Sequence, residues 1–216
     1  MNQVPEALLA LEQQKILSLK DILEKEFLLY PRTSGRLGNW LFCWASAFAI
    51  SKESKMQIVT SKSWELYQIF GEQLGGIAIN NELINSPDWK FVKEENFIYD
   101  PLLISKISEA MNISRKIGVV YYLQSWRYFH PKYRKQILEM FRFPKGIEMA
   151  AMYTISKIKS KFTNKIFVAV HVRRTDLASY LGADGPGPEY LQKAANYFIK
   201  KYQNVYRFSS SVSQIK

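Results

Sequence analysis

A predicted strand, a glycine-containing loop and an apolar helix follow one another between residues 26 and 52, and this order restricts the fold more than any other feature. EFLLY, residues 26–30, has the length and apolar content of a short strand. The loop PRTSGRLGN leads from it into WLFCWASAFAISK, which is apolar almost all round and is predicted to be a buried helix. This succession is typical of α/β folds.

Strand-like runs and helical patterns continue to alternate along the chain. Amphipathic helices are predicted over residues 6–26 and 147–160, and Pro188 suits the first turn of another helix. Proline and glycine interrupt the pattern at Phe143–Gly146, where we place the domain boundary. The alternation predicts an α/β fold, whose further strands cover residues 56–60, 76–79, 117–124, 166–172 and 204–209.

Composition excludes several classes of protein. With 47% hydrophobic residues, a chain of 216 residues can bury a core and is expected to be globular. No window approaches the length of a membrane span, and the first residues lack the features of a secretory signal. The single cysteine, Cys43, rules out an internal disulfide and a metal site of paired cysteines.

The net charge of +11 is concentrated in one region. Residues 130–174 hold eleven lysines and arginines against two glutamates. One interpretation is a solvated basic helix face. The other is a positive field that attracts phosphates, whether of nucleic acid, an anionic membrane or a nucleotide.

The stretch KIFVAVHVRRTD ends a predicted strand in charged and polar residues. Ligands of parallel α/β sheets gather beyond the carboxyl ends of the strands, which is where His171, Arg173, Arg174 and Asp176 fall. The arginine fork matches phosphate oxygens, and alternation along a strand lets one arginine face a ligand while the other pairs with Asp176. The alternative is that both arginines only form ion pairs at the strand end.

The loop SGRLGNW, residues 34–40, is the second candidate site. Gly35 and Gly38 permit a positive φ or a close backbone approach, and Asn39 is able to cap the helix that follows. A helix that starts here presents N–H groups to an anion. The pattern matches neither of the usual glycine-rich nucleotide-binding motifs, so alone it leaves a purely structural role open.

Taken together, these motifs resemble a known family. GRLGN with its apolar helix, GVVYYLQSWRYF, VAVHVRRTD, EYLQKAANYF and NVYRFSSS occur in this order in the α-1,2-fucosyltransferases of glycosyltransferase family 11, and the resemblance spans roughly residues 30–212. It implies a GT-B-like architecture and transfer of L-fucose from GDP-β-L-fucose to the 2-hydroxyl of a terminal galactose, with inversion. It also implies residence in the Golgi, where family members act on galactose-terminated glycans.

The resemblance assigns domains and roles. Residues 1–29 would be a helical extension, 30–145 a Rossmann-like acceptor-side domain, and 146–216 the incomplete beginning of a Rossmann-like GDP-fucose-binding domain. Arg173 and Arg36 would be catalytic, and donor or acceptor contacts would come from Asn39, His171, Arg174 and Asp176. The sequence has no Asp-x-Asp pair, so we expect metal-independent transfer without a cofactor. Asp184 and Glu189 lie near the expected position of a general base, without a clear assignment.

The chain departs from the family pattern in several places. Trp40 stands where glutamine is usual, and Thr175 stands where glycine is usual. The family continues beyond the last strand into the rest of the donor half, and a membrane anchor common in animal members is missing, so this chain is expected to be an incomplete copy of doubtful activity. The alternatives are a non-catalytic glycan- or nucleotide-binding remnant and a basic nucleic-acid binder; for the second, no recognisable nucleic-acid module is present.

Overall fold

A computed structural model describes residues 21–32, 35–95, 98–120, 123–162, 166–169, 187–202 and 205–206. The chain separates into two compact units, residues 1–144 and residues 145–216. The candidate residues His171, Arg173, Arg174 and Asp176, together with Thr175 and Asp184, lie outside the described residues. Arg36, Asn39 and Trp40 lie inside them.

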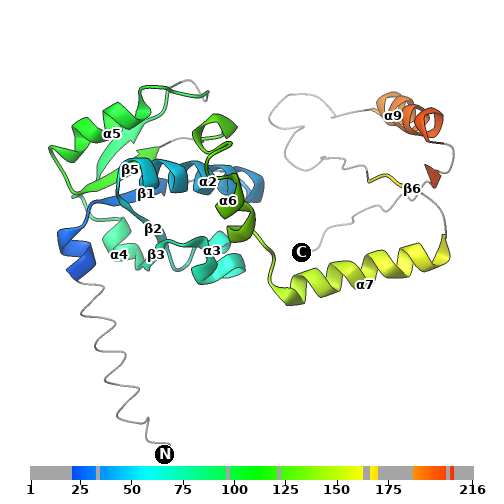
Figure 1. Cartoon of the computed structure of the whole chain (residues 1–216), viewed down its shortest axis with the longest axis horizontal. Coiled ribbons are helices and arrows are strands. Elements are labelled where there is room, and N and C mark those ends of the chain that lie inside the picture. The colour runs from blue at the N-terminus through cyan, green and yellow to red at the C-terminus, as the bar shows by residue number, and fades with distance from the viewer. Residues whose placement is uncertain are drawn as a thin grey trace, which may run out of the picture. The chain divides into compact units, whose positions relative to one another are not determined.

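The first unit is built on a parallel sheet of five strands in the order β3-β2-β1-β5-β4 (Figure 1). Every described pair is parallel, and β1 occupies the centre between β2 and β5. This Rossmann-like arrangement confirms the predicted α/β fold class. The strands are β1 (Leu28–Arg32), β2 (Gln57–Ser61), β3 (Ile77–Ile79), β4 (Lys90–Lys93) and β5 (Lys116–Val120).

Helices connect the strands and cover the sheet. α2 packs against β1 and β2, and α5 packs against β4 and β5. The prediction that the segment after the glycine loop is a buried helix is confirmed, because nine consecutive residues of α2, Cys43 to Ser51, are buried. The elements are α2 (Leu37–Glu53), α3 (Glu65–Phe70), η1 (Gly71–Leu74), α4 (Asn81–Ile84), α5 (Leu103–Met111), η2 (Trp126–Tyr128) and α6 (Arg134–Met140).

Successive strand residues contribute to two different cores. Leu29 and Ile58 belong to the larger apolar cluster, which includes residues of α2, α5 and α6. Leu28 and Val59 belong to a smaller cluster, against which Leu83 and Ile84 of α4 pack. Both faces of the central strands are therefore covered, as the alternation of side chains along a strand requires.

The sequence predictions differ from the structure in several places. β1 spans Leu28–Arg32 rather than residues 26–30, and residues 168 and 169 of the strand predicted over 166–172 lie outside β6 (Ile166–Phe167). β5 ends at Val120 rather than at residue 124, since Leu123 has a φ of 43° that is incompatible with a strand. β4 was not expected, because lysines stand at both of its ends. α2 begins at Leu37, so Asn39 lies inside its first turn and Arg36 takes the N-cap position that we predicted for Asn39.

The described part of the second unit contains a parallel strand pair and two long helices. β6 (Ile166–Phe167) pairs in parallel with β7 (Val205–Tyr206), and α9 (Pro188–Lys201) lies between them in the chain. Pro188 occupies the first turn of α9, as predicted. Neither α9 nor α7 (Lys145–Lys161) has a buried residue.

Candidate ligand site at the carboxyl edge of the sheet

The glycine loop lies directly after the central strand β1, at the edge where parallel sheets bind ligands. Gly35 has a φ of +86°, a conformation that side chains other than glycine rarely adopt. A methyl group on Gly35 would lie 1.9 Å from Nδ2 of Asn39, so the Asn39 side chain occupies the space that this glycine leaves. Gly38 has no such neighbour within 4 Å. The structure thus brings Asn39 against Gly35 and leaves Arg36 exposed between β1 and α2.

Trp40 connects this loop to the core. Its ring meets Trp64 edge-on, with 6.3 Å between the ring centroids, and Trp64 in turn lies 5.5 Å from Trp44. Trp40 is half-buried and packs against the larger apolar cluster. Trp40 therefore has a packing role here.

A pocket of about 370 Å³ lies beyond the ends of β1 and β2. This volume falls in the range of roughly 300–1,000 Å³ typical of small-molecule sites. Most of its wall is polar but uncharged, and the sequence analysis did not predict this pocket. The lining residues are Tyr30, Pro31, Thr60, Ser61, Ser63, Trp64, Glu65, Asn81, Ile84 and Asn85.

Three of the polar side chains in this pocket form a hydrogen-bonded group. The Ser61 hydroxyl donates to Oδ1 of Asn81 at 2.6 Å and lies 2.8 Å from the Ser63 hydroxyl. Nδ2 of Asn81 donates to Oγ of Ser63 at 3.1 Å. Asn81 is the first residue of α4, whereas the serines belong to the end of β2 and the turn after it. Register between β2 and β3 brings the two segments together, which is why residue spacing alone did not reveal the group.

Two other residues that line this pocket each have a buried polar atom without a hydrogen-bond partner. These atoms are Oγ1 of Thr60 and Nε1 of Trp64. Thr60 is 1% exposed. Leaving a buried hydroxyl or indole N–H unpaired costs about 1–3 kcal/mol, and such groups are often found where a ligand or water completes the site.

A second polar group lies at the carboxyl end of β4. Glu94 is 1% exposed; its Oε1 accepts from the Tyr128 hydroxyl at 2.6 Å and its Oε2 accepts from the Leu123 amide at 2.9 Å. Burial raises the pKa of the Glu94 carboxyl, and the hydrogen bonds from Tyr128 and Leu123 oppose this rise. The carboxyl therefore fixes the position of Leu123 and of Tyr128. This role could not be predicted from the sequence around Glu94.

Cys43 is buried in α2 close to this carboxyl. Burial and the nearby charge of Glu94 raise the pKa of the Cys43 thiol to about 12. A thiol of such high pKa stays protonated at neutral pH and is a poor nucleophile. Cys43 is a packing residue.

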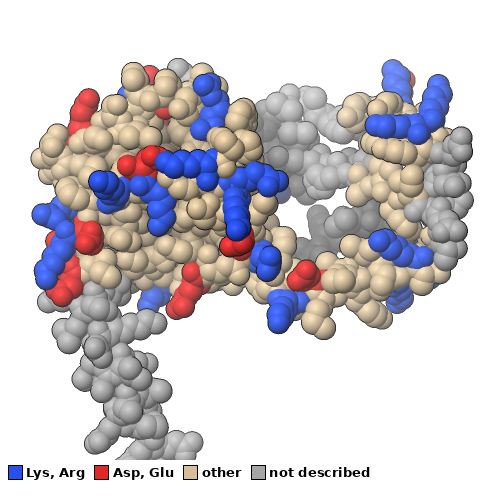
Figure 2. Space-filling model, in the orientation of Figure 1, with Lys and Arg blue, Asp and Glu red and all other residues tan. Residues whose placement is uncertain are grey.

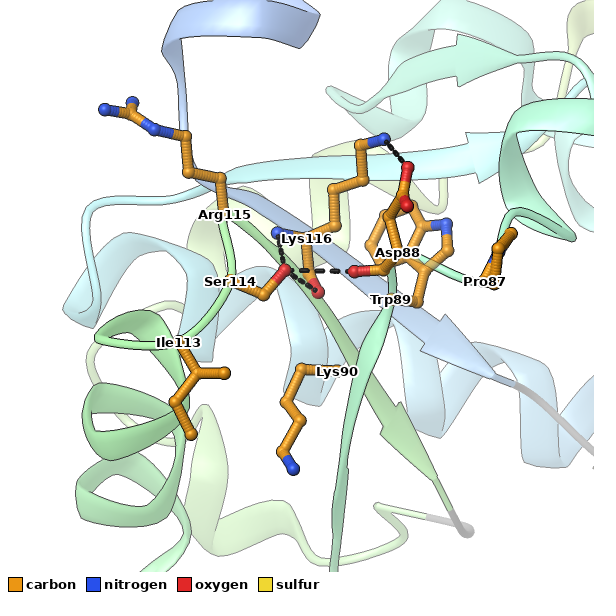
Figure 3. Close-up of a pocket in the computed structure, with 8 residues that line it drawn as sticks. All are labelled: Pro87, Asp88, Trp89, Lys90, Ile113, Ser114, Arg115 and Lys116. Carbon is orange, nitrogen blue, oxygen red and sulfur yellow. Dashed lines mark hydrogen bonds and ion pairs between the residues drawn. The ribbon is translucent and has the colours of Figure 1, made fainter.

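The opposite, amino edge of the sheet has a pocket of different character (Figure 3). The Lys116 ammonium lies 2.9 Å from Oδ2 of Asp88, and the Ser114 hydroxyl donates to the backbone carbonyl of Asp88 at 3.0 Å. Figure 3 shows these groups directed at one another. Because it lies away from the carboxyl ends of the strands, we do not treat this pocket as the candidate site.

The distribution of surface charges can be compared with the positive field that the sequence suggested. On the face drawn in Figure 2, acidic side chains are interspersed with the basic ones over the first unit. Lys132, at the start of the basic region, forms an ion pair with Glu53 at 2.6 Å. The first unit therefore offers no uniform cationic face in this view.

The described residues form neither a metal-binding cluster nor a membrane-spanning helix. In the part of the chain that the structure describes, no three His, Cys, Asp or Glu side chains gather closely enough to hold a metal ion. Within the described ranges, no helix combines the length and the apolar content needed to cross a membrane. No protein-family model matches the chain, and a search of curated proteins finds no match.

Proposed function

We propose that the chain is a fucosyltransferase of the α-1,2 type with a GT-B-like arrangement, in which the first unit is the acceptor side and the second unit begins the GDP-fucose side. The observation that carries this proposal is the position of Arg36 and Asn39. Arg36 lies in the glycine loop that follows the central strand of a parallel sheet, and Asn39 lies in the first turn of the buried helix that this loop opens. This is the place where α/β proteins bind ligands.

The second unit supports the proposal through its chain order. β6, α9 and β7 form a parallel βαβ unit, and the residues His171–Asp176 follow β6 in the sequence. In the proposed reaction, the 2-hydroxyl oxygen of galactose forms a bond to the anomeric carbon of fucose while the bond from that carbon to the β-phosphate oxygen breaks. The hydroxyl proton passes to a base or to water, GDP leaves, and negative charge grows on the phosphate oxygens. The Arg173 fork stabilises this charge, and Arg174 pairs with Asp176 to hold the segment.

The proposal is tested by measuring transfer of labelled fucose from GDP-fucose to lactose with the full chain and two arginine variants. Arg173→Lys keeps the charge but loses the bidentate fork, so we expect transfer to fall by about 10²-fold. Arg174→Lys is expected to lower the melting temperature and to retain measurable transfer. Equal rates for wild type and Arg173→Lys would refute the phosphate role.

A second function, glycan or nucleotide binding without catalysis, is favoured by one observation. The described helices of the second unit bury none of their residues, so its helices are less firmly packed than those of the first unit. Under this alternative, the chain would bind a galactoside or GDP without forming a fucosylated product. Calorimetric titration with each compound, run beside the transfer assay, separates the two functions.

A further inference from the structure

The pocket at the ends of β1 and β2 is lined mainly by uncharged residues. Among the described residues that line it, Glu65 alone carries a charge. An anion would meet this carboxylate without a lining lysine or arginine to offset it. One carboxylate also provides little negative charge for a Ca²⁺ site, which takes six to eight oxygen ligands. The remaining lining groups are uncharged, and a neutral ligand matches them best.

The uncharged part of the wall suits a ligand with many hydroxyl groups. Ser61, Ser63 and Asn81 supply hydroxyl and amide groups that both donate and accept, and their mutual hydrogen bonds hold them in place before a ligand arrives. Tyr30 and Trp64 add aromatic surface beside these groups. A sugar ring has the matching combination of hydroxyl groups and C–H faces.

Two atoms of residues that line this pocket, Oγ1 of Thr60 and Nε1 of Trp64, lack a hydrogen-bond partner that a ligand could provide. Binding of a hydroxylated ligand to both atoms requires Thr60 to change its χ1 rotamer and Trp64 to shift, because both atoms are buried in the unliganded structure. The indole N–H groups of the two buried tryptophans are already hydrogen-bonded. Trp44 donates to the Leu74 carbonyl at 3.1 Å, and Trp89 donates to the Leu83 carbonyl at 2.8 Å.

We propose that this pocket binds a neutral, hydroxyl-rich ring of the size of one hexose, through Ser63, Asn81, Thr60 and Trp64. The proposal does not rest on fucosyl transfer, because the pocket is formed within the first unit and needs no nucleotide. A single ring forms few hydrogen bonds, so we expect a dissociation constant of about millimolar order.

Indole N–H resonances of the ¹⁵N-labelled full chain provide the test. Methyl β-D-galactoside, added without any nucleotide, is expected to shift the Trp64 resonance, identified by its loss in Trp64→Phe, and to leave those of Trp44 and Trp89 in place. Inorganic phosphate at the same concentration is expected to leave all three unchanged. An unmoved Trp64 resonance with methyl β-D-galactoside and with methyl α-D-glucoside would overturn the proposal, as would an equal shift with phosphate.

Two variants locate the binding groups. Asn81→Ala, at an exposed helix position, is expected to weaken galactoside binding about tenfold, the loss of about one good hydrogen bond, whereas the matched control Asn112→Ala, at the end of α5, is expected to bind as wild type does. Thr60→Val keeps the side-chain shape, so the unliganded chain is expected to be at least as stable and to bind more weakly. Wild-type affinity in both Asn81→Ala and Thr60→Val would overturn the assignment of the pocket.

Discussion

The two units of the chain place their apolar residues in opposite environments. In the first unit, α2 buries nine consecutive residues, and Trp44 is fully buried. In the second, α7 exposes Met149 and Met152 by 69% and 63%, and neither of its described helices has a buried residue. Isolated helices of this length are marginal in water, so the first unit holds the stability that positions the carboxyl-edge site.

The positions of the tryptophans allow unfolding of the two units to be measured separately. All five tryptophans, at positions 40, 44, 64, 89 and 126, belong to the first unit. Tryptophan fluorescence therefore follows unfolding of the first unit alone, whereas far-ultraviolet circular dichroism follows helices of both.

Trp44→Ala is expected to have the largest effect. Its ring is fully buried and its indole N–H is bonded to the Leu74 carbonyl, so the substitution should lower the free energy of unfolding by about 3–5 kcal/mol. Urea unfolding followed by circular dichroism measures the loss. Met152→Ala, in the exposed α7, is the control and should stay within about 0.5 kcal/mol of wild type. Equal losses in the two variants would contradict the difference between the units.

Glu94→Gln is expected to cost about 1–3 kcal/mol, because an amide cannot accept through both of its terminal atoms from Tyr128 and Leu123. It also changes the pH dependence. The folded-state pKa of Glu94 is raised, so its contribution to stability is present below the ordinary glutamate pKa of about 4.3 and is lost as pH rises through the folded-state pKa.

Fluorescence-monitored urea unfolding at several pH values from about 3 to 8 measures this contribution as the difference between wild type and Glu94→Gln. Wild type should lose stability relative to the variant as pH rises above about 4.3. A difference that is independent of pH would show that burial does not raise this pKa. Glu95→Gln, at an exposed neighbour, serves as the control for the change of net charge.

Two glycines give a smaller contrast between the units. Gly35→Ala places a side chain at a φ of +86° and against Asn39, so we expect a loss of about 1–2 kcal/mol. Gly146→Ala, in α7, meets no atom within 4 Å and should stabilise that helix by about 0.5 kcal/mol. Thermal unfolding by circular dichroism compares them, and a loss in both variants would show that α7 is packed more tightly than its exposure indicates.

The sequence indicated the strands with continuous apolar runs and the buried helix α2, because those patterns record burial directly. It failed at β4, where lysines flank two apolar residues, and at the end of the strand predicted over 117–124, because Leu123 and Gln124 lie outside β5. The pocket group of Ser61, Ser63 and Asn81 could not be predicted, since pairing of β2 with β3 brings these residues together. The position of Arg36 beside β1 was predicted, because a strand, loop and helix are local in the chain.

Analysis of the product formed by the full chain from GDP-β-L-fucose and lactose tests the proposed function most directly. The proposal predicts a fucosylated lactose with an α-linkage to the 2-hydroxyl of galactose, identified by nuclear magnetic resonance, and predicts about 10²-fold less of it from Arg173→Lys. The contradicting result is the absence of any fucosylated product together with release of free fucose no faster than in buffer alone.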